Sequence, residues 1–148
     1  MIDIHERSPD QPKPSGHNRR IKVCAHRGSS GTHPENTAAA YDEAVRVGAD
    51  MIEFDVRRCR DGGFIVMHDP AVDRTTNGSG MIADLSSDEI RRLDAGNGEQ
   101  VPKLGQAFAY AERMILNVHA YPETDEDVES MADVLVELFS TPPAYDRG

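Results

Sequence analysis

The chain has 148 residues, which is enough for one domain with a core but short of the roughly 250 residues typical of a complete eight-stranded α/β barrel. Its formal net charge of −10 at pH 7 argues against nucleic acid or an anionic membrane surface as the main partner, because both would repel it. No apolar run approaches the roughly 18 residues of a membrane span, and two cysteines are too few for a disulfide framework, so we expect reduced thiols in a cytoplasmic setting.

The first predicted strand ends at a histidine and an arginine. Residues 1–19 are rich in proline and charge and have no apolar periodicity, which predicts a disordered polar leader. The apolar run 21–25 then predicts a buried strand that places His26 and Arg27 at its carboxyl end, before Gly28. A neutral imidazole can move a proton near pH 7, and a guanidinium offers a fixed fork of donors for a phosphate. The alternative is that both residues simply end a strand at the surface.

A capped helix and a strand with one charged face follow. Capping side chains at 34–37 precede the Ala-rich run 38–45, which predicts a helix that stops at Gly48. Residues 51–56 alternate, with apolar side chains on one face and Glu53 and Asp55 on the other.

The two carboxylates of this strand project from the same face and can both reach one cation. Their hard oxygen ligands favour Mg²⁺ or Ca²⁺. A solvated strand face is the alternative. Charged pairs that point into a fold are uncommon unless they are paired or metal-bound, which favours a metal or ion-pair role for Glu53 and Asp55.

A second histidine lies at the end of another predicted strand. A turn at 61–63 leads into a short strand, 64–67, that ends at His68, and the turn-forming residues 73–80 predict a loop. The capping box of Ser86 and Glu89 predicts a brief helix through Leu93, and a helix over 102–113 and a strand over 115–118 follow. A last helix begins at Thr124 and stops at Thr141. Its apolar face carries Val128, Met131, Leu135 and Leu138.

Five motifs, in their order and spacing, resemble those of the glycerophosphodiester phosphodiesterase family. They are His26-Arg27-Gly28, Pro34-Glu35-Asn36-Thr37, Glu53-Phe54-Asp55, His68-Asp69 and Asp73-Arg74-Thr75-Thr76-Asn77-Gly78. The resemblance implies a TIM-type (β/α) barrel that hydrolyses glycerophosphodiesters to sn-glycerol 3-phosphate and an alcohol with a bound divalent cation, Mg²⁺ or Ca²⁺. Residues 20–148 would form the N-terminal half of that barrel, with four strands and with the family's insertion at 69–111 between the third and fourth.

The resemblance also implies roles for individual residues. By position, His26 and His68 would be the general acid and base pair, Arg27 a phosphate contact, and Glu53 and Asp55 metal ligands. The small-molecule phosphodiester would be the partner of the site.

The chain departs from the family at the end of its fourth strand, where His119 and Tyr121 occupy the positions of a glutamate and a lysine. His119 can still bind a metal, and an imidazole ligand shifts the preference toward Mn²⁺, Co²⁺ or Zn²⁺. The alternative is that His119 is a strand-end residue without a ligand role.

The second departure is length, because the chain ends after four strands. Two functions therefore stay open: phosphodiester hydrolysis, and a non-catalytic remnant that binds a phosphorylated ligand or is inactive. Since half a barrel leaves strand edges open, we also expect a homo-oligomer.

Overall fold

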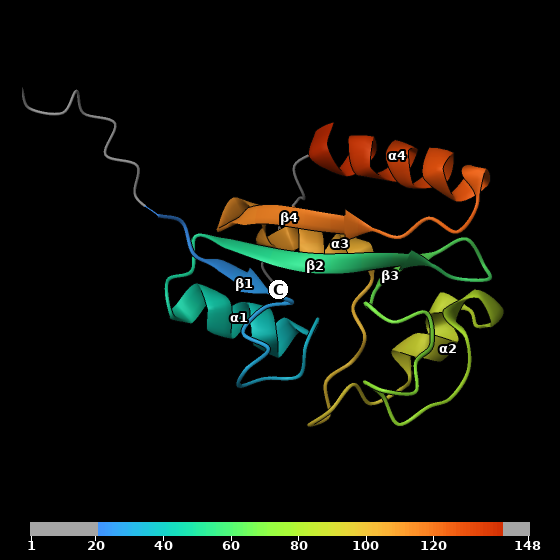
Figure 1. The fold of residues 1–148 in the computed structure, drawn as a ribbon, viewed down its shortest axis with the longest axis horizontal. Helices are drawn as coiled ribbons and strands as arrows, with labels where there is room; N and C mark the ends of the chain where they lie inside the picture. Colours follow the sequence, from blue (N-terminus) through green and yellow to red (C-terminus); the bar gives the residue numbers. More distant parts are fainter. Residues whose placement is uncertain (1–20, 141–148) are drawn as a thin grey trace, which may run out of the picture.

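A computed structural model describes residues 21–140 as one mixed sheet with helices packed against it (Figure 1). The strands are β1 (Cys24–His26), β2 (Met51–Arg58), β3 (Phe64–Val66) and β4 (Ile115–Ala120). The central strand, β2, pairs in parallel with β4 along one edge. Along its other edge it pairs in parallel with β1 and then antiparallel with β3. The predicted leader, 1–19, and the predicted helix stop at Thr141 lie outside the described residues.

The antiparallel strand follows from the short connection between β2 and β3. The backbone N–H of Cys59 donates to the carbonyl of Gly63 at 2.8 Å, which closes a tight turn. A parallel pairing would need a crossover of about a dozen residues. The sequence-based prediction of a half barrel therefore corresponds to a partial α/β sheet in which three strands are parallel and one is not.

The helices agree with the capping signals of the sequence. Thr37 accepts a hydrogen bond from the Ala40 N–H at the start of α1, and the capping box of Ser86 opens α2. Thr124 and Asp127 bond each other's backbone N–H at the start of α4. The described helical elements are α1 (Ala38–Arg46), η1 (Ile82–Asp84), α2 (Ser87–Arg91), α3 (Leu104–Phe108), η2 (Ala109–Glu112) and α4 (Asp125–Ser140).

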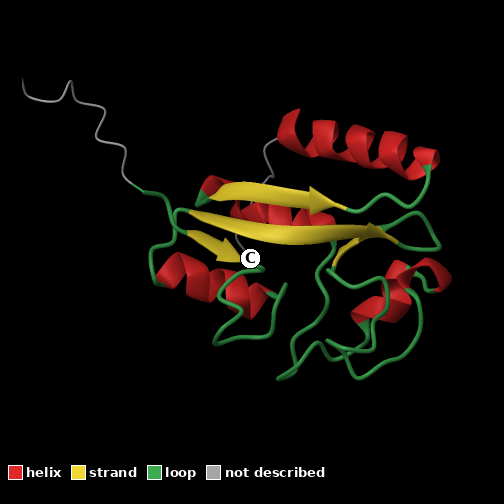
Figure 2. Ribbon diagram, in the orientation of Figure 1, coloured by secondary structure: helices red, strands yellow, loops and turns green. Residues whose placement is uncertain are grey.

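The main core lies between the apolar face of β2 and three helices. Ile52, Phe54 and Val56 pack with residues of α1, α3 and α4, including Tyr41 and Phe108. A second apolar cluster, which contains Ile65 of β3 with Val72, Ile82 and Ile90, forms the interior of the segment between β3 and α3, which Figure 2 shows as mostly loop. This arrangement leaves the charged face of β2 turned away from the helices.

Two predictions of burial are wrong. The strand predicted at 21–25 is observed only at Cys24–His26, and Ile21 and Val23 are 88% and 60% exposed, because β1 pairs with β2 along one edge only. In α4, Val128 is exposed while Met131 is buried. The reason is that α4 lies beside β4 at the edge of the sheet, so only a narrow stripe of the helix contacts the core (Figure 1). The helix predicted over 102–113 is also shorter, since it changes to a 3₁₀ helix at Ala109.

Both cysteines, Cys24 and Cys59, are free thiols, as predicted from the sequence. Burial raises the pKa of Cys59 to about 12, so this thiol is unreactive near neutral pH. Within residues 21–140, no helix is both long and apolar enough to cross a membrane.

Gly28 is predicted to tolerate a side chain less well than Gly48, although both have a positive φ, +76° and +77°. An added Cβ at Gly28 would lie 2.7 Å from the Ala40 Cβ, whereas Gly48 has open space. Gly48→Ala should lower the free energy of unfolding by about 1 kcal/mol, the cost of the left-handed conformation. Gly28→Ala should lower it by about 1–3 kcal/mol more through overpacking. Urea denaturation measures both, and equal losses would contradict the close packing at Gly28.

Candidate active site

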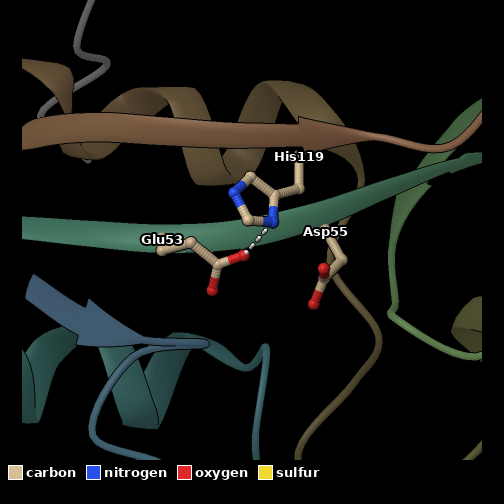
Figure 3. A group of neighbouring side chains, drawn as sticks. All are labelled: Glu53, Asp55 and His119. Carbon is tan, nitrogen blue, oxygen red and sulfur yellow. Dashed lines mark ion pairs between the residues drawn. The ribbon is translucent and has the colours of Figure 1, made fainter.

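Strand register brings two carboxylates and one imidazole to a single point (Figure 3). Glu53 and Asp55 lie two residues apart on β2, and His119 of β4 is the register partner of Asp55. Ligand atoms of the three side chains all lie within 4.8 Å of one another. The carboxylates are buried, with residue exposures of 2% and 1%, whereas His119 is exposed. The parallel register of β2 with β4 produces this convergence, because it sets His119 beside Asp55.

Arg27 contacts both carboxylates of this group. Its φ of 55° turns the chain sharply after β1, a conformation that costs a non-glycine residue about 1–2 kcal/mol. The turn lets the Arg27 backbone N–H donate to Glu53 Oε2 at 2.9 Å and sets the guanidinium Nε 3.2 Å from Asp55 Oδ2. The guanidinium also donates to Glu35 Oε1 at 2.9 Å. Arg27 therefore partly neutralises the buried carboxylates from both backbone and side chain.

Asn36 holds Asp55 from the second side. Its amide Nδ2 donates to Asp55 Oδ2 at 3.0 Å, and its Oδ1 accepts from the Tyr41 hydroxyl at 3.2 Å, which orients the amide. Asn36 is buried and, like Arg27, has a positive φ. The sequence placed Asn36 only among the capping side chains before α1 and did not predict its bond to Asp55. A polar residue before a capped helix is typical of a turn, so no local signal indicates that Asn36 bonds Asp55, 19 residues away.

The two predicted catalytic histidines occupy different environments. His26 Nε2 lies 3.8 Å from Glu53 Oε2 and its side chain is two-thirds exposed. His68 Nδ1 lies 2.7 Å from Asp69 Oδ1, and no contact between His68 and the buried carboxylates is observed in the described part of the chain. The structure thus brings His26 to the carboxylates and gives His68 a carboxylate partner of its own.

A chain of ion pairs connects these two regions. Arg74 donates to both oxygens of Asp69 and to both oxygens of Glu35, at distances between 2.6 and 3.0 Å. The Arg74 guanidinium holds the pKa of both carboxyls below their ordinary values, and His68 lowers that of Asp69 further. Because an ionised Asp69 can only accept, the Nδ1 of His68 carries the proton and its Nε2 is the ring nitrogen that can take a proton from a substrate. Sequence reasoning missed this role of Glu35, Asp69 and Arg74, although all three stand in the quoted motifs.

Tyr121 follows β4 directly, on the same side of the strand as His119. Its ring meets the imidazole of His68 edge to face, with centroids 5.7 Å apart. Desolvation raises the pKa of the Tyr121 phenol, and the negative charge of Asp55 raises it further. Tyr121 therefore presents a neutral hydroxyl toward the carboxylates.

The donor set of Glu53, Asp55 and His119 fits a divalent cation. Glu53 Oε1 is fully buried and has no hydrogen-bond partner among the described residues, although His119 Nδ1 lies 3.1 Å away. A buried carboxylate oxygen without a partner is costly in a protein interior, and a cation would satisfy it. The remaining ligands of such an ion would have to come from water or substrate, because the group supplies three protein side chains.

Comparison with known proteins agrees with the resemblance found in the sequence. The model of the "Glycerophosphoryl diester phosphodiesterase family" matches residues 26–146. YhdW of Bacillus subtilis is 51% identical over 89 residues, which are 55% of this chain and 37% of YhdW. A glycerophosphodiester phosphodiesterase of Caldanaerobacter subterraneus is 48% identical over 93 residues, which are 58% of this chain and 38% of that protein. This chain therefore spans less than two thirds of the length of these relatives.

Solved structures are similar over most of this chain and about half of their own length. A glycerophosphodiester phosphodiesterase from Agrobacterium tumefaciens superposes with a TM-score of 0.74 at 36% identity, over 81% of this chain and 54% of its own. An Oleispira antarctica phosphodiesterase in complex with the product sn-glycerol-3-phosphate superposes with a TM-score of 0.76 at 33% identity, over 85% of this chain and 54% of its own.

The Arg74 ion pairs are predicted to stabilise the fold in a pH-dependent way. Carboxyls with a lowered pKa bind fewer protons when folded, so their stabilisation is present above the ordinary value of about 4 and is lost as the pH falls through the lowered value. Arg74→Gln should lower the free energy of unfolding at pH 7 by about 1 kcal/mol, a value reduced because Arg74 is half exposed. The difference from the parent chain should shrink on acidification.

Urea denaturation at about pH 7 and about pH 3 measures this difference on either side of the ordinary carboxyl pKa. Arg46→Gln is the matched control, because Arg46 pairs with Glu43 on the surface of α1 and its side chain is 72% exposed. If Arg74→Gln lowers the free energy of unfolding no more than Arg46→Gln does, the ion pairs of Arg74 have no structural role.

Proposed function

This chain belongs to the glycerophosphoryl diester phosphodiesterase family, and from that membership we propose that it takes part in the hydrolysis of glycerophosphodiesters to sn-glycerol 3-phosphate and an alcohol. The observation that carries the proposal is the convergence of Glu53, Asp55 and His119 beside His26 and Arg27, where β1 ends. The product named for the Oleispira antarctica structure is consistent with this substrate class.

We propose that His26 and His68 share the proton transfers. One imidazole takes the proton of the oxygen that attacks phosphorus, and the other donates a proton to the alcohol oxygen as its bond to phosphorus breaks. The bond between His68 Nδ1 and Asp69, which leaves Nε2 as the ring nitrogen that can accept a proton, supports a role as the base. Arg27, held beside the carboxylates by Glu35, can direct its remaining N–H groups to a phosphate oxygen.

We further propose that Glu53, Asp55 and His119 hold one divalent cation. Such an ion, when bound, supplies positive charge that neutralises the phosphate and polarises its oxygens. The family resemblance favours Mg²⁺ or Ca²⁺, whereas two carboxylates with one imidazole favour Mn²⁺, Co²⁺ or Zn²⁺.

Three further proposals concern the setting of the site. The sheet is the first half of a (β/α) barrel, in which residues 69–111 form an insertion on the head-group side of the site. The free thiols support a cytoplasmic setting, which cell fractionation would test. The edge of β4 away from β2 pairs with no strand among residues 21–140, and Ile115 is exposed, which supports a homo-oligomer. Light scattering that gives the mass of a monomer would contradict the last proposal.

Incubation with glycerophosphocholine and a divalent cation tests the function. We expect sn-glycerol 3-phosphate to form, and EDTA to stop its formation. Binding of glycerophosphocholine without turnover, measured by calorimetry, would instead favour the non-catalytic reading of the chain.

If turnover occurs, it is predicted to need both histidines. His26→Ala and His68→Ala should each lower kcat by about 10² to 10⁴, because each removes one proton transfer. His33→Ala is the control, since His33 bonds Thr32 away from the carboxylates and should leave kcat unchanged. Retention of activity in either of the first two variants would argue against the paired role.

The metal preference is predicted to depend on His119. Calorimetric titration of Mg²⁺, Ca²⁺, Mn²⁺ and Zn²⁺ should give tighter binding of Mn²⁺ and Zn²⁺ to the parent chain, and His119→Glu should restore the preference for Mg²⁺ or Ca²⁺. An unchanged order of affinities in His119→Glu would mean that His119 is not a ligand.

A further inference from the structure

Tyr121 and Arg57 meet beside the imidazole of His68. The Tyr121 backbone N–H donates to the Val56 carbonyl at 3.0 Å, so the pairing of β2 with β4 continues past the end of β4 and places Tyr121 next to Arg57. The Arg57 guanidinium lies over the Tyr121 ring, with Cζ 4.7 Å from the ring centroid. The Tyr121 ring is nearly perpendicular to the imidazole of His68, with an interplanar angle of 79°.

Arg57 also holds the backbone of His68. Its Nε donates to the His68 carbonyl at 2.7 Å, and a second guanidinium nitrogen lies 3.3 Å from Glu123 Oε1. The Arg57 side chain is only 12% exposed. The guanidinium is therefore fixed at three places, by a carbonyl, a carboxylate and an aromatic face, and His68 is one of the residues that it fixes.

The charge of Arg57 explains why an aromatic residue suits position 121. A lysine at this position would bring a second positive charge to a guanidinium that is already largely buried, and the two would repel each other. The face of an aromatic ring instead attracts a cation, and the ring edge can pack against an imidazole. Arg57 and Tyr121 are thus chemically compatible with each other.

We propose that Arg57 and Tyr121 form a stacked pair that positions the His68 imidazole, so that both are positioning residues for the proton transfer at His68. Asp69 selects the tautomer of the ring, Arg57 holds the backbone carbonyl, and Tyr121 limits rotation of the ring. The catalytic consequence rests on the proposed function, whereas the geometry of the ring does not.

Nitrogen NMR of the imidazole tests the proposal without requiring turnover. At about pH 8, where an ordinary imidazole is neutral, we expect His68 to show one tautomer with the proton on Nδ1 in the full chain. Tyr121→Phe keeps the ring and should keep this spectrum. Tyr121→Leu removes the ring and should shift the His68 ring signals and broaden them or mix the tautomers, while the backbone amide spectrum elsewhere stays unchanged.

Tyr110→Leu is the matched control, because Tyr110 packs edge to face on Tyr41 at 5.3 Å, away from His68, and should leave the His68 signals unchanged. If Tyr121→Leu fails to fold, Arg57→Gln replaces it, since that change removes the cation and should loosen the same imidazole. His68 signals that are unaltered in the folded variant would overturn the proposal.

Kinetics separates this inference from the proposed function. In a chain that turns over, Tyr121→Leu should lower kcat by up to about 10²-fold through misplacement of the imidazole, with little change in KM, while Tyr121→Phe stays near the parent value. An inactive parent chain with the expected NMR result would refute the proposed function and support the positioning of His68. An active parent chain in which Tyr121→Leu changes neither kcat nor the His68 spectrum would support the proposed function and refute the positioning of His68.

Discussion

The burial of two carboxylates side by side on one strand is the constraint on which the rest of the site depends. Glu53 and Asp55 are almost completely removed from solvent, and isolated charges in that position would be strongly unfavourable. The backbone N–H and guanidinium of Arg27 and the amide of Asn36 stabilise these charges. Both residues adopt a left-handed backbone conformation to reach the carboxylates, so part of the folding free energy maintains the geometry of the site.

The same negative charge organises the loops around the strand ends. Glu35 accepts hydrogen bonds from both Arg27 and Arg74, and Arg74 in turn holds Asp69 beside His68. Two loops that are distant in the sequence, the one after β1 and the one after β3, are therefore connected by alternating charges. In such a network the removal of one member leaves another charge without its partner, which is why the orientation of His68 depends on residues that it does not touch.

The end of β4 adds two ring side chains to the surroundings of the site. His119 brings an imidazole to a pair of carboxylates, and Tyr121 brings an aromatic ring to a largely buried guanidinium. Both rings thus lie against charged side chains of β2.

The sequence by itself determined the local elements and the residue types of the site. The alternation of β2, the capping side chains of α1, α2 and α4, and the histidines at two strand ends were all predicted, because period and capping depend on residues within a turn or two of each other. Only the tertiary structure decided which side chains meet. The ion pair of Glu35 with Arg74 spans 39 residues, and the bond of Asn36 with Asp55 joins a loop to a strand interior. Exposure of β1 likewise depends on which strands lie beside it, and no local pattern carries that information, since a period of two specifies the faces of a strand but not its neighbours.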